Sequence, residues 1–148
     1  YGCLQSHVNA IRHANDNNFE SILVFEDDVT FRDDFVSMAN KFFEEVPDTW
    51  WSIFLGSNFQ GGHHKISESV ARGRAFGAQA FLLKNPLFNT IIEWGDSTAD
   101  RPIDVFYADE IQSRPTNYFA VPQLCSQEPG HSDISNMHVD HRGVLGGF

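Results

Sequence analysis

The sequence lacks any long apolar run and is poor in basic residues. Its longest apolar stretches, such as residues 22–25, have the length of a β-strand, whereas a helix that crosses a bilayer needs about 20 apolar residues. Ten basic residues stand against 20 acidic ones, which gives a formal net charge of −10. This balance argues against nucleic acid as a partner, because binding to a phosphate backbone requires a basic stripe. It does not exclude a nucleotide ligand, because a bound divalent cation can reverse the sign of a local site.

Cysteine is also scarce. Cys3 and Cys125 can form one disulfide or none, and we expect two reduced thiols. No secretory signal is visible, but the sequence begins at Tyr1 without a methionine, as a fragment or a processed product would. The cellular location therefore stays open: the cytoplasm, or a compartment that the sequence does not identify.

What the sequence does contain favours one layered α/β domain. A length of 148 residues suits a single domain with a real hydrophobic core, and 14 phenylalanines predict that this core is rich in aromatic rings. Segments with apolar residues at helical spacing alternate with short apolar runs typical of strands. Helices are predicted at residues 6–15, 34–46, 86–94 and 103–112, and strands at residues 21–25, 51–55, 76–83 and 118–121. Residues 56–73 and the polar tail from Gln127 onward are expected to be loops.

Three consecutive carboxylates follow the strand predicted at residues 21–25, which we expect to be buried, central and parallel. They are Glu26, Asp27 and Asp28, at the end of a strand where open α/β sheets place their ligands. Adjacent carboxylates repel one another unless water or a cation neutralises them, and hard oxygen ligands favour Mg²⁺ or Mn²⁺. The pattern therefore predicts a divalent-metal site. The alternative is that Asp27 and Asp28 cap a loop while Glu26 is solvated.

Several segments, taken together and in order, carry a resemblance. They are GCLQSH at residues 2–7, ILVFEDDV at 22–29, GAQAFLL at 77–83, PID at 102–104, PQL at 122–124, Gln127, and SDI at 132–134. This series resembles glycosyltransferase family 25, which includes lipopolysaccharide-biosynthesis transferases and procollagen galactosyltransferases. The resemblance covers most of the chain, although any one segment alone would be a weak match.

The resemblance implies a GT-A fold, a UDP-sugar donor and Mn²⁺, with Mg²⁺ as the other candidate. It matches the acidic cluster with the family's DxD-type motif, so Asp28 is assigned as metal ligand and Glu26 or Asp27 as a contact to the metal or the ribose. The backbone of Gly77 and Ala78 is then expected to border the acceptor and the donor sugar.

One departure from the family concerns its N-terminal nucleotide-binding βα half, which usually precedes the GCLQSH segment. We therefore expect a GT-A-like layered sheet with flanking helices that lacks this half. Either the sequence is a fragment, or a partner chain supplies the half, or the protein is a minimal relative.

Two further residues are candidates for the chemistry. Asp104 is predicted as the general base, because an inverting transfer needs a carboxylate to remove the proton from the acceptor hydroxyl. It follows Pro102 at a predicted helix start, so a capping role is an equal alternative. His131 is predicted as a further metal ligand, because many GT-A enzymes complete their metal site with a histidine or aspartate near the C-terminal end. Asp133 is the other candidate for that place, and a surface-loop histidine is the alternative interpretation of His131.

The loop at residues 56–73 and its border carry weaker candidates. Arg72 and Arg74 have the chemistry to pair with phosphate, and a solvated loop is the equal alternative. The adjacent His63 and His64 are poorly spaced for one metal ion.

The predicted function is a metal-dependent inverting transfer of a hexose from a UDP-sugar to the hydroxyl of a glycan or of a protein side chain. The metal on Asp28 would hold the diphosphate while Asp104 deprotonates the acceptor. A non-catalytic relative that binds glycan or metal is the main alternative. A metal-dependent phosphohydrolase is a weaker one.

Overall fold

The computed structural model describes residues 2–97, 99–128, 130–132 and 137–139. Its main feature is a six-stranded sheet in the order β1-β6-β3-β7-β5-β4. These strands are β1 (Ser21–Phe25), β3 (Ser52–Phe59), β4 (His64–Lys65), β5 (Val70–Arg72), β6 (Ala75–Lys84) and β7 (Asn117–Ala120). Two further pairs are β2 (Val29–Phe31) with β8 (Cys125–Gln127), and β9 (Gly130–Ser132) with β10 (Met137–Val139).

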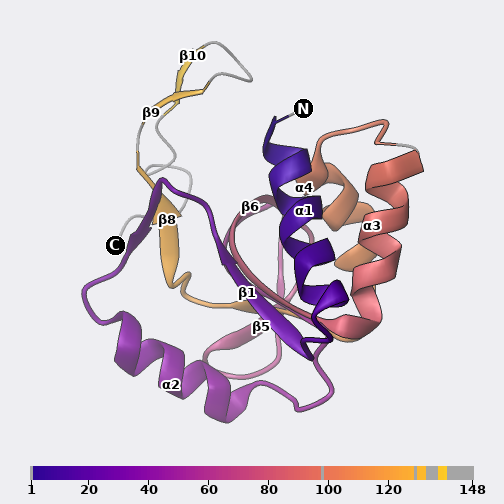
Figure 1. Cartoon of the computed structure of the whole chain (residues 1–148). Coiled ribbons are helices and arrows are strands. Elements are labelled where there is room, and N and C mark those ends of the chain that lie inside the picture. The colour runs from indigo at the N-terminus through magenta and orange to yellow at the C-terminus, as the bar shows by residue number, and fades with distance from the viewer. Residues whose placement is uncertain (1, 98, 129, 133–136, 140–148) are drawn as a thin grey trace.

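Helices cover both faces of this sheet (Figure 1). Most of them gather on one face: α1 (Gly2–Asp16), α3 (Phe88–Ser97) and α4 (Ile103–Phe106), with α2 (Phe35–Glu45) on the other side of the molecule. A 3-10 turn, η1 (Asn85–Leu87), leads into α3, and a π-helical turn, η2 (Tyr107–Ile111), continues α4. Among the described residues, no helix is both long enough and apolar enough to cross a membrane.

The two faces of the sheet bury separate cores. Phe54 and Phe81 pack with residues of α1, α3, α4 and η2, whereas Ile53 and Leu55 pack with α2 and β8. The alternation of Ile53, Phe54 and Leu55 between the cores follows from the two-residue repeat of a strand. Several of the largest buried side chains are aromatic, as the phenylalanine content predicted.

The predicted helices are confirmed, with shifts of a few residues at their ends. Apolar residues at helical spacing account for this agreement, because they form the buried stripes of α1, α2 and α3. Asp34 stands at the N-cap position of α2, but its carboxylate pairs with Arg32 and makes no capping hydrogen bond.

The prediction of a central parallel strand at residues 21–25 is wrong. β1 lies at the edge of the sheet, and its one strand partner among the described residues is β6, which runs antiparallel to it. Ile22 and Val24 pack against the core, whereas Leu23 and Phe25 are 50% and 39% exposed. A continuous apolar run indicates a strand, but it does not fix the strand's place in the sheet.

The sheet as a whole is mostly antiparallel, since its one parallel pair among the described strands is β3 with β7. The alternation of helical and strand segments did predict a mixed α/β domain, but not this strand direction. Residues 56–73 are also more ordered than the predicted loop. β3 runs through Gly56, with register shifts on either side of it, as far as Phe59, and residues 64–65 and 70–72 form β4 and β5.

Candidate functional site

The acidic segment forms a turn between β1 and β2. The amide of Glu26 donates to the carbonyl of Gln79 on β6 at 2.9 Å, and the amide of Val29 donates back to the carbonyl of Glu26 at 3.3 Å. The carbonyl of Asp28 accepts from the amide of Glu128, just beyond β8, at 2.9 Å. Backbone bonds to two neighbouring segments therefore hold the acidic turn in place.

The two carboxylate oxygens of Glu26 face different partners. Its Oε1 lies 3.2 Å from His7 Nε2 and 3.6 Å from Cys3 Sγ, both on α1. Its Oε2 accepts a hydrogen bond from Gln127 Nε2 at 3.0 Å. The same Gln127 nitrogen lies 3.3 Å and 3.4 Å from the two carboxylate oxygens of Asp28. The carboxylates of Glu26 and Asp28 thus converge on one amide group.

The local electrostatics differ between these two carboxylates. The hydrogen bond to His7 is the main reason that the pKa of Glu26 lies below its usual value. Burial is the main reason that the pKa of Asp28 lies above its usual value, and the charge of Glu26 adds to the rise while Gln127 opposes it. A cation between the two groups would relieve this repulsion, and hard oxygen donors suit Mn²⁺ or Mg²⁺.

Asp104 lies beside the same region, in the first turn of α4. Its Oδ1 accepts from the amide of Val105 at 2.8 Å, and its Oδ2 accepts from the amide of Gly77 on β6 at 3.4 Å. The thiol of Cys3 lies close enough to the carboxylates of Glu26 and Asp104 to feel the charge of each. Burial raises the pKa of the Cys3 thiol to about 11, with smaller contributions from Glu26 and then Asp104. The structure therefore brings Glu26, Asp28, Gly77 and Asp104 into one neighbourhood.

Other predicted site residues stand apart or are only partly described. Asp27 is exposed, and no hydrogen bond of its side chain is found among the described residues. Ala78 is 4% exposed, with its methyl group in the core beneath the site. His131 lies on β9, which pairs with β10 in a hairpin that projects from the body of the molecule (Figure 1). The side chain of His131 and all of Asp133 lie outside what the structure describes, so their roles as ligands stay predictions.

Contacts of Cys3, His7 and Gln127 with the acidic turn were not predicted from the sequence. A signal was present for two of them. Cys3 and His7 are four residues apart, a spacing that places both on one face of α1, although the helix was predicted only from residue 6. Gln127 belongs to the closing segments of the resemblance, but its contact with the acidic turn depends on the β2–β8 pairing, which joins residues about 100 positions apart.

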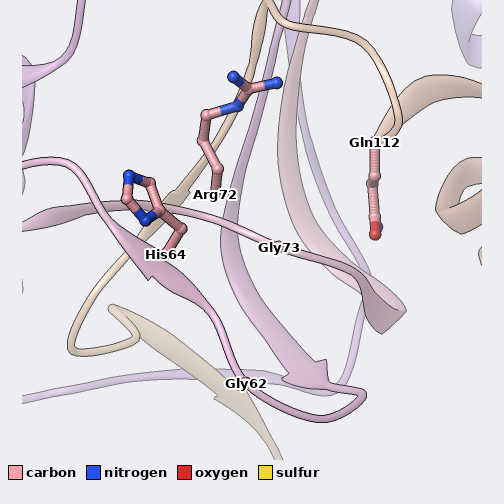
Figure 2. A pocket seen from close by; sticks show the side chains of 5 residues that line it. All are labelled: Gly62, His64, Arg72, Gly73 and Gln112. Atoms are coloured by element: carbon pink, nitrogen blue, oxygen red, sulfur yellow. The ribbon is translucent and has the colours of Figure 1, made fainter.

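Most of the weaker candidates have partners within the chain. Arg74 is held by Asp109 at 2.7 Å, and the ring of His63 stacks on Phe59. Figure 2 shows Arg72 and His64 at a hollow whose lining residues are Gly62, His64, Arg72, Gly73 and Gln112. Arg72 donates to the carbonyl of Arg114 at 3.2 Å, which fixes one end of its guanidinium group.

The comparison with known families agrees with the resemblance. The sequence model of glycosyltransferase family 25, described as an LPS biosynthesis protein, matches residues 1–94. The chain belongs to this family, because the match covers more than half of its length. The matched part includes α1, the acidic turn and β6, while Asp104 and Gln127 lie beyond it. No curated protein matches the sequence.

Proposed function

We propose that this protein is a metal-dependent inverting glycosyltransferase that moves a hexose from a UDP-sugar to a hydroxyl group of a glycan or a protein. Membership of the family supports glycosyl transfer in general. The observation that carries the finer proposal is the convergence of Glu26 and Asp28 on Gln127 Nε2, at the end of β1. Two carboxylates held this way can share a cation with the oxygens of a diphosphate.

Asp28 would be the principal ligand of Mn²⁺ or Mg²⁺, with Glu26 contacting either the metal or the ribose. When bound, the cation would neutralise the negative charge that grows on the departing diphosphate. Gln127 positions both carboxylates through the hydrogen bonds described above. His131 stays a proposed additional ligand, on the β9–β10 hairpin.

Asp104 would accept the proton of the attacking hydroxyl. Each of its oxygens receives one backbone N–H, and a carboxylate oxygen has a second lone pair available for a substrate hydroxyl. The capping interpretation is compatible with this role, because the same hydrogen bonds fix the carboxylate in one orientation at the edge of the site. Gly77 and Ala78 would border the sugars through their backbone.

A nucleotide-binding segment would complete the donor site along β1. The outer edge of β1 has no strand partner among the described residues, and Phe25 and Phe31 next to it are 39% and 49% exposed. Apolar side chains beside an open strand edge suit a covering strand and helix. We propose that the family's N-terminal half, from the same polypeptide or from a partner chain, occupies this edge.

Release of UDP from UDP-galactose and UDP-glucose tests the catalytic proposal, with Mn²⁺ present and water as acceptor. We expect Asp104→Asn to slow release by about 10²- to 10⁴-fold, the range that general-base catalysis contributes. Asp48→Asn, at an exposed carboxylate, should leave the rate unchanged. Unaltered release by Asp104→Asn would refute the assigned base. Mn²⁺ binding without release by the wild-type protein would favour the non-catalytic relative.

A further inference from the structure

A second group of potential metal ligands lies on the opposite side of Glu26 from Asp28. Cys3 and His7 are one helical turn apart on α1, and both point at Glu26 Oε1. The sulfur, the imidazole nitrogen and the carboxylate oxygen all lie within 4.8 Å of one another. Asp28 does not belong to this group. Its contact runs through Gln127 to the other oxygen, Glu26 Oε2.

The spacing of these three atoms is close to that of a tetrahedral zinc site. Ligand distances of ~2.0–2.3 Å place neighbouring ligands of a tetrahedral zinc ion about 3.3–3.6 Å apart. Glu26 Oε1 is already 3.2 Å from His7 Nε2 and 3.6 Å from Cys3 Sγ. Closing the remaining sulfur-to-nitrogen gap requires a rotation of the Cys3 side chain near the start of α1.

The surroundings favour a cation with a partly dry coordination shell. His7 is 4% exposed, and its ring lies 5.3 Å from the ring of Phe81 and 6.2 Å from that of Tyr107. The hydroxyl of Tyr107 is fully buried and has no hydrogen-bond partner among the described residues. Its pKa is raised mainly by burial, with further contributions from Cys3 and Glu26, so the hydroxyl lies in the field of the same cluster. A water molecule or substrate oxygen on a bound ion would give this hydroxyl a partner.

We propose that Cys3, His7 and Glu26 Oε1 bind Zn²⁺, at a site separate from the Mn²⁺ or Mg²⁺ position proposed at Asp28. A thiolate, an imidazole and a carboxylate form a mixed S/N/O set, which suits Zn²⁺ better than the harder cations. Three protein ligands leave a fourth position open for water or substrate. Glu26 would give Oε1 to this site, which leaves Oε2 for the contact to the metal or the ribose proposed at the donor site. The inference does not depend on glycosyl transfer.

Titration of the full chain with Co²⁺, a spectroscopic substitute for Zn²⁺, tests this inference. We expect visible bands of tetrahedral Co²⁺ and a near-ultraviolet sulfur-to-cobalt band, both removed by an equivalent of Zn²⁺. Cys3→Ser should abolish the sulfur band and weaken Co²⁺ binding by more than about tenfold. Cys125→Ser is the matched control and should leave the spectrum unchanged, because Cys125 is buried in the other core.

Two further variants separate this site from the donor site. Glu26→Gln should weaken Co²⁺ binding, whereas Asp28→Asn should keep the sulfur band even if it abolishes UDP binding. Circular dichroism of each variant is the check that it is folded. The inference is overturned if wild-type protein shows no sulfur band, if the band survives Cys3→Ser, or if Asp28→Asn removes it.

Discussion

At the scale of single residues, Glu26 connects the parts of the site. Its backbone amide is held by β6, one carboxylate oxygen faces α1, and the other faces Gln127. A substitution of Glu26 therefore disturbs several contacts at once. Asp28 and Cys3 are better probes, because each reports on one side of the carboxylate.

The backbone conformation of Gly77 favours glycine. Its φ is +88°, and a Cβ added there would lie 2.6 Å from the side-chain oxygen of the buried Gln79. An alanine at this position raises the free energy of the folded state, because its Cβ disfavours a positive φ and also forces Gln79 to move. We expect Gly77→Ala to lower the free energy of unfolding by about 1–3 kcal/mol, as measured by urea denaturation.

Gly62→Ala is the matched control for Gly77→Ala, since a Cβ at Gly62 meets no atom within 4 Å. It should change the free energy of unfolding by less than about 0.5 kcal/mol. Equal stability of the two variants would show that the conformation at Gly77 is not needed for the fold.

The sequence predicted the acidic cluster, Asp104 and the Gly77 segment, because residue type and order carry that information. It did not predict that Glu26 turns one oxygen toward Cys3 and His7. That contact depends on where α1 lies beside the sheet, and α1 packs on both α3 and β1, which neither segment's sequence reveals alone.

At the scale of elements, Glu45 ties the end of α2 to the turn between β4 and β5. One of its carboxylate oxygens accepts bonds from the hydroxyl of Ser67 at 2.6 Å and from the amide and hydroxyl of Ser69, each at 2.8 Å. These bonds, led by that from Ser67, lower the pKa of Glu45 from 4.5 to about 2. The ionised carboxylate therefore stabilises the fold at pH values above the pKa that Glu45 has in the unfolded chain.

This stabilisation is lost as the pH falls from about 4.5 toward about 2, because the folded state then has to take up a proton it binds weakly. Glu45→Gln should make the midpoint of urea unfolding less dependent on pH across that interval. Glu44→Gln, at the exposed neighbouring residue, should keep the wild-type dependence. A wild-type pH profile in Glu45→Gln would contradict the role of this carboxylate.

The helices were easier to predict from the sequence than the short strands β4 and β5. Helices with one apolar stripe, such as α1 and α2, are visible in the sequence because a 3.6-residue repeat persists over several turns. β4 consists of two polar residues and β5 of three residues, so their sequences do not differ from those of a loop. β5 joins the sheet by pairing with β7, which follows about 50 residues later, and β4 pairs with β5.

At the scale of the whole molecule, the position of β1 is the main correction to the sequence analysis. The apolar run at residues 22–25 predicted a strand with neighbours on both sides, and the described chain supplies one neighbour, β6. Leu23 and Phe25 alternate along β1 with the core-facing Ile22 and Val24, and both are exposed. We proposed above that a nucleotide-binding segment joins the sheet at this open edge.

In the proposed function, the acidic turn binds a nucleotide diphosphate through a divalent cation. Calorimetric titration of UDP into the protein, with and without Mn²⁺, tests it most directly, using Asp28→Asn beside Asp33→Asn at an exposed carboxylate. We expect binding that requires Mn²⁺, is weakened by more than about tenfold in Asp28→Asn, and is unchanged in Asp33→Asn. UDP binding that is indifferent to Mn²⁺ and to Asp28, or no binding at all, would contradict it.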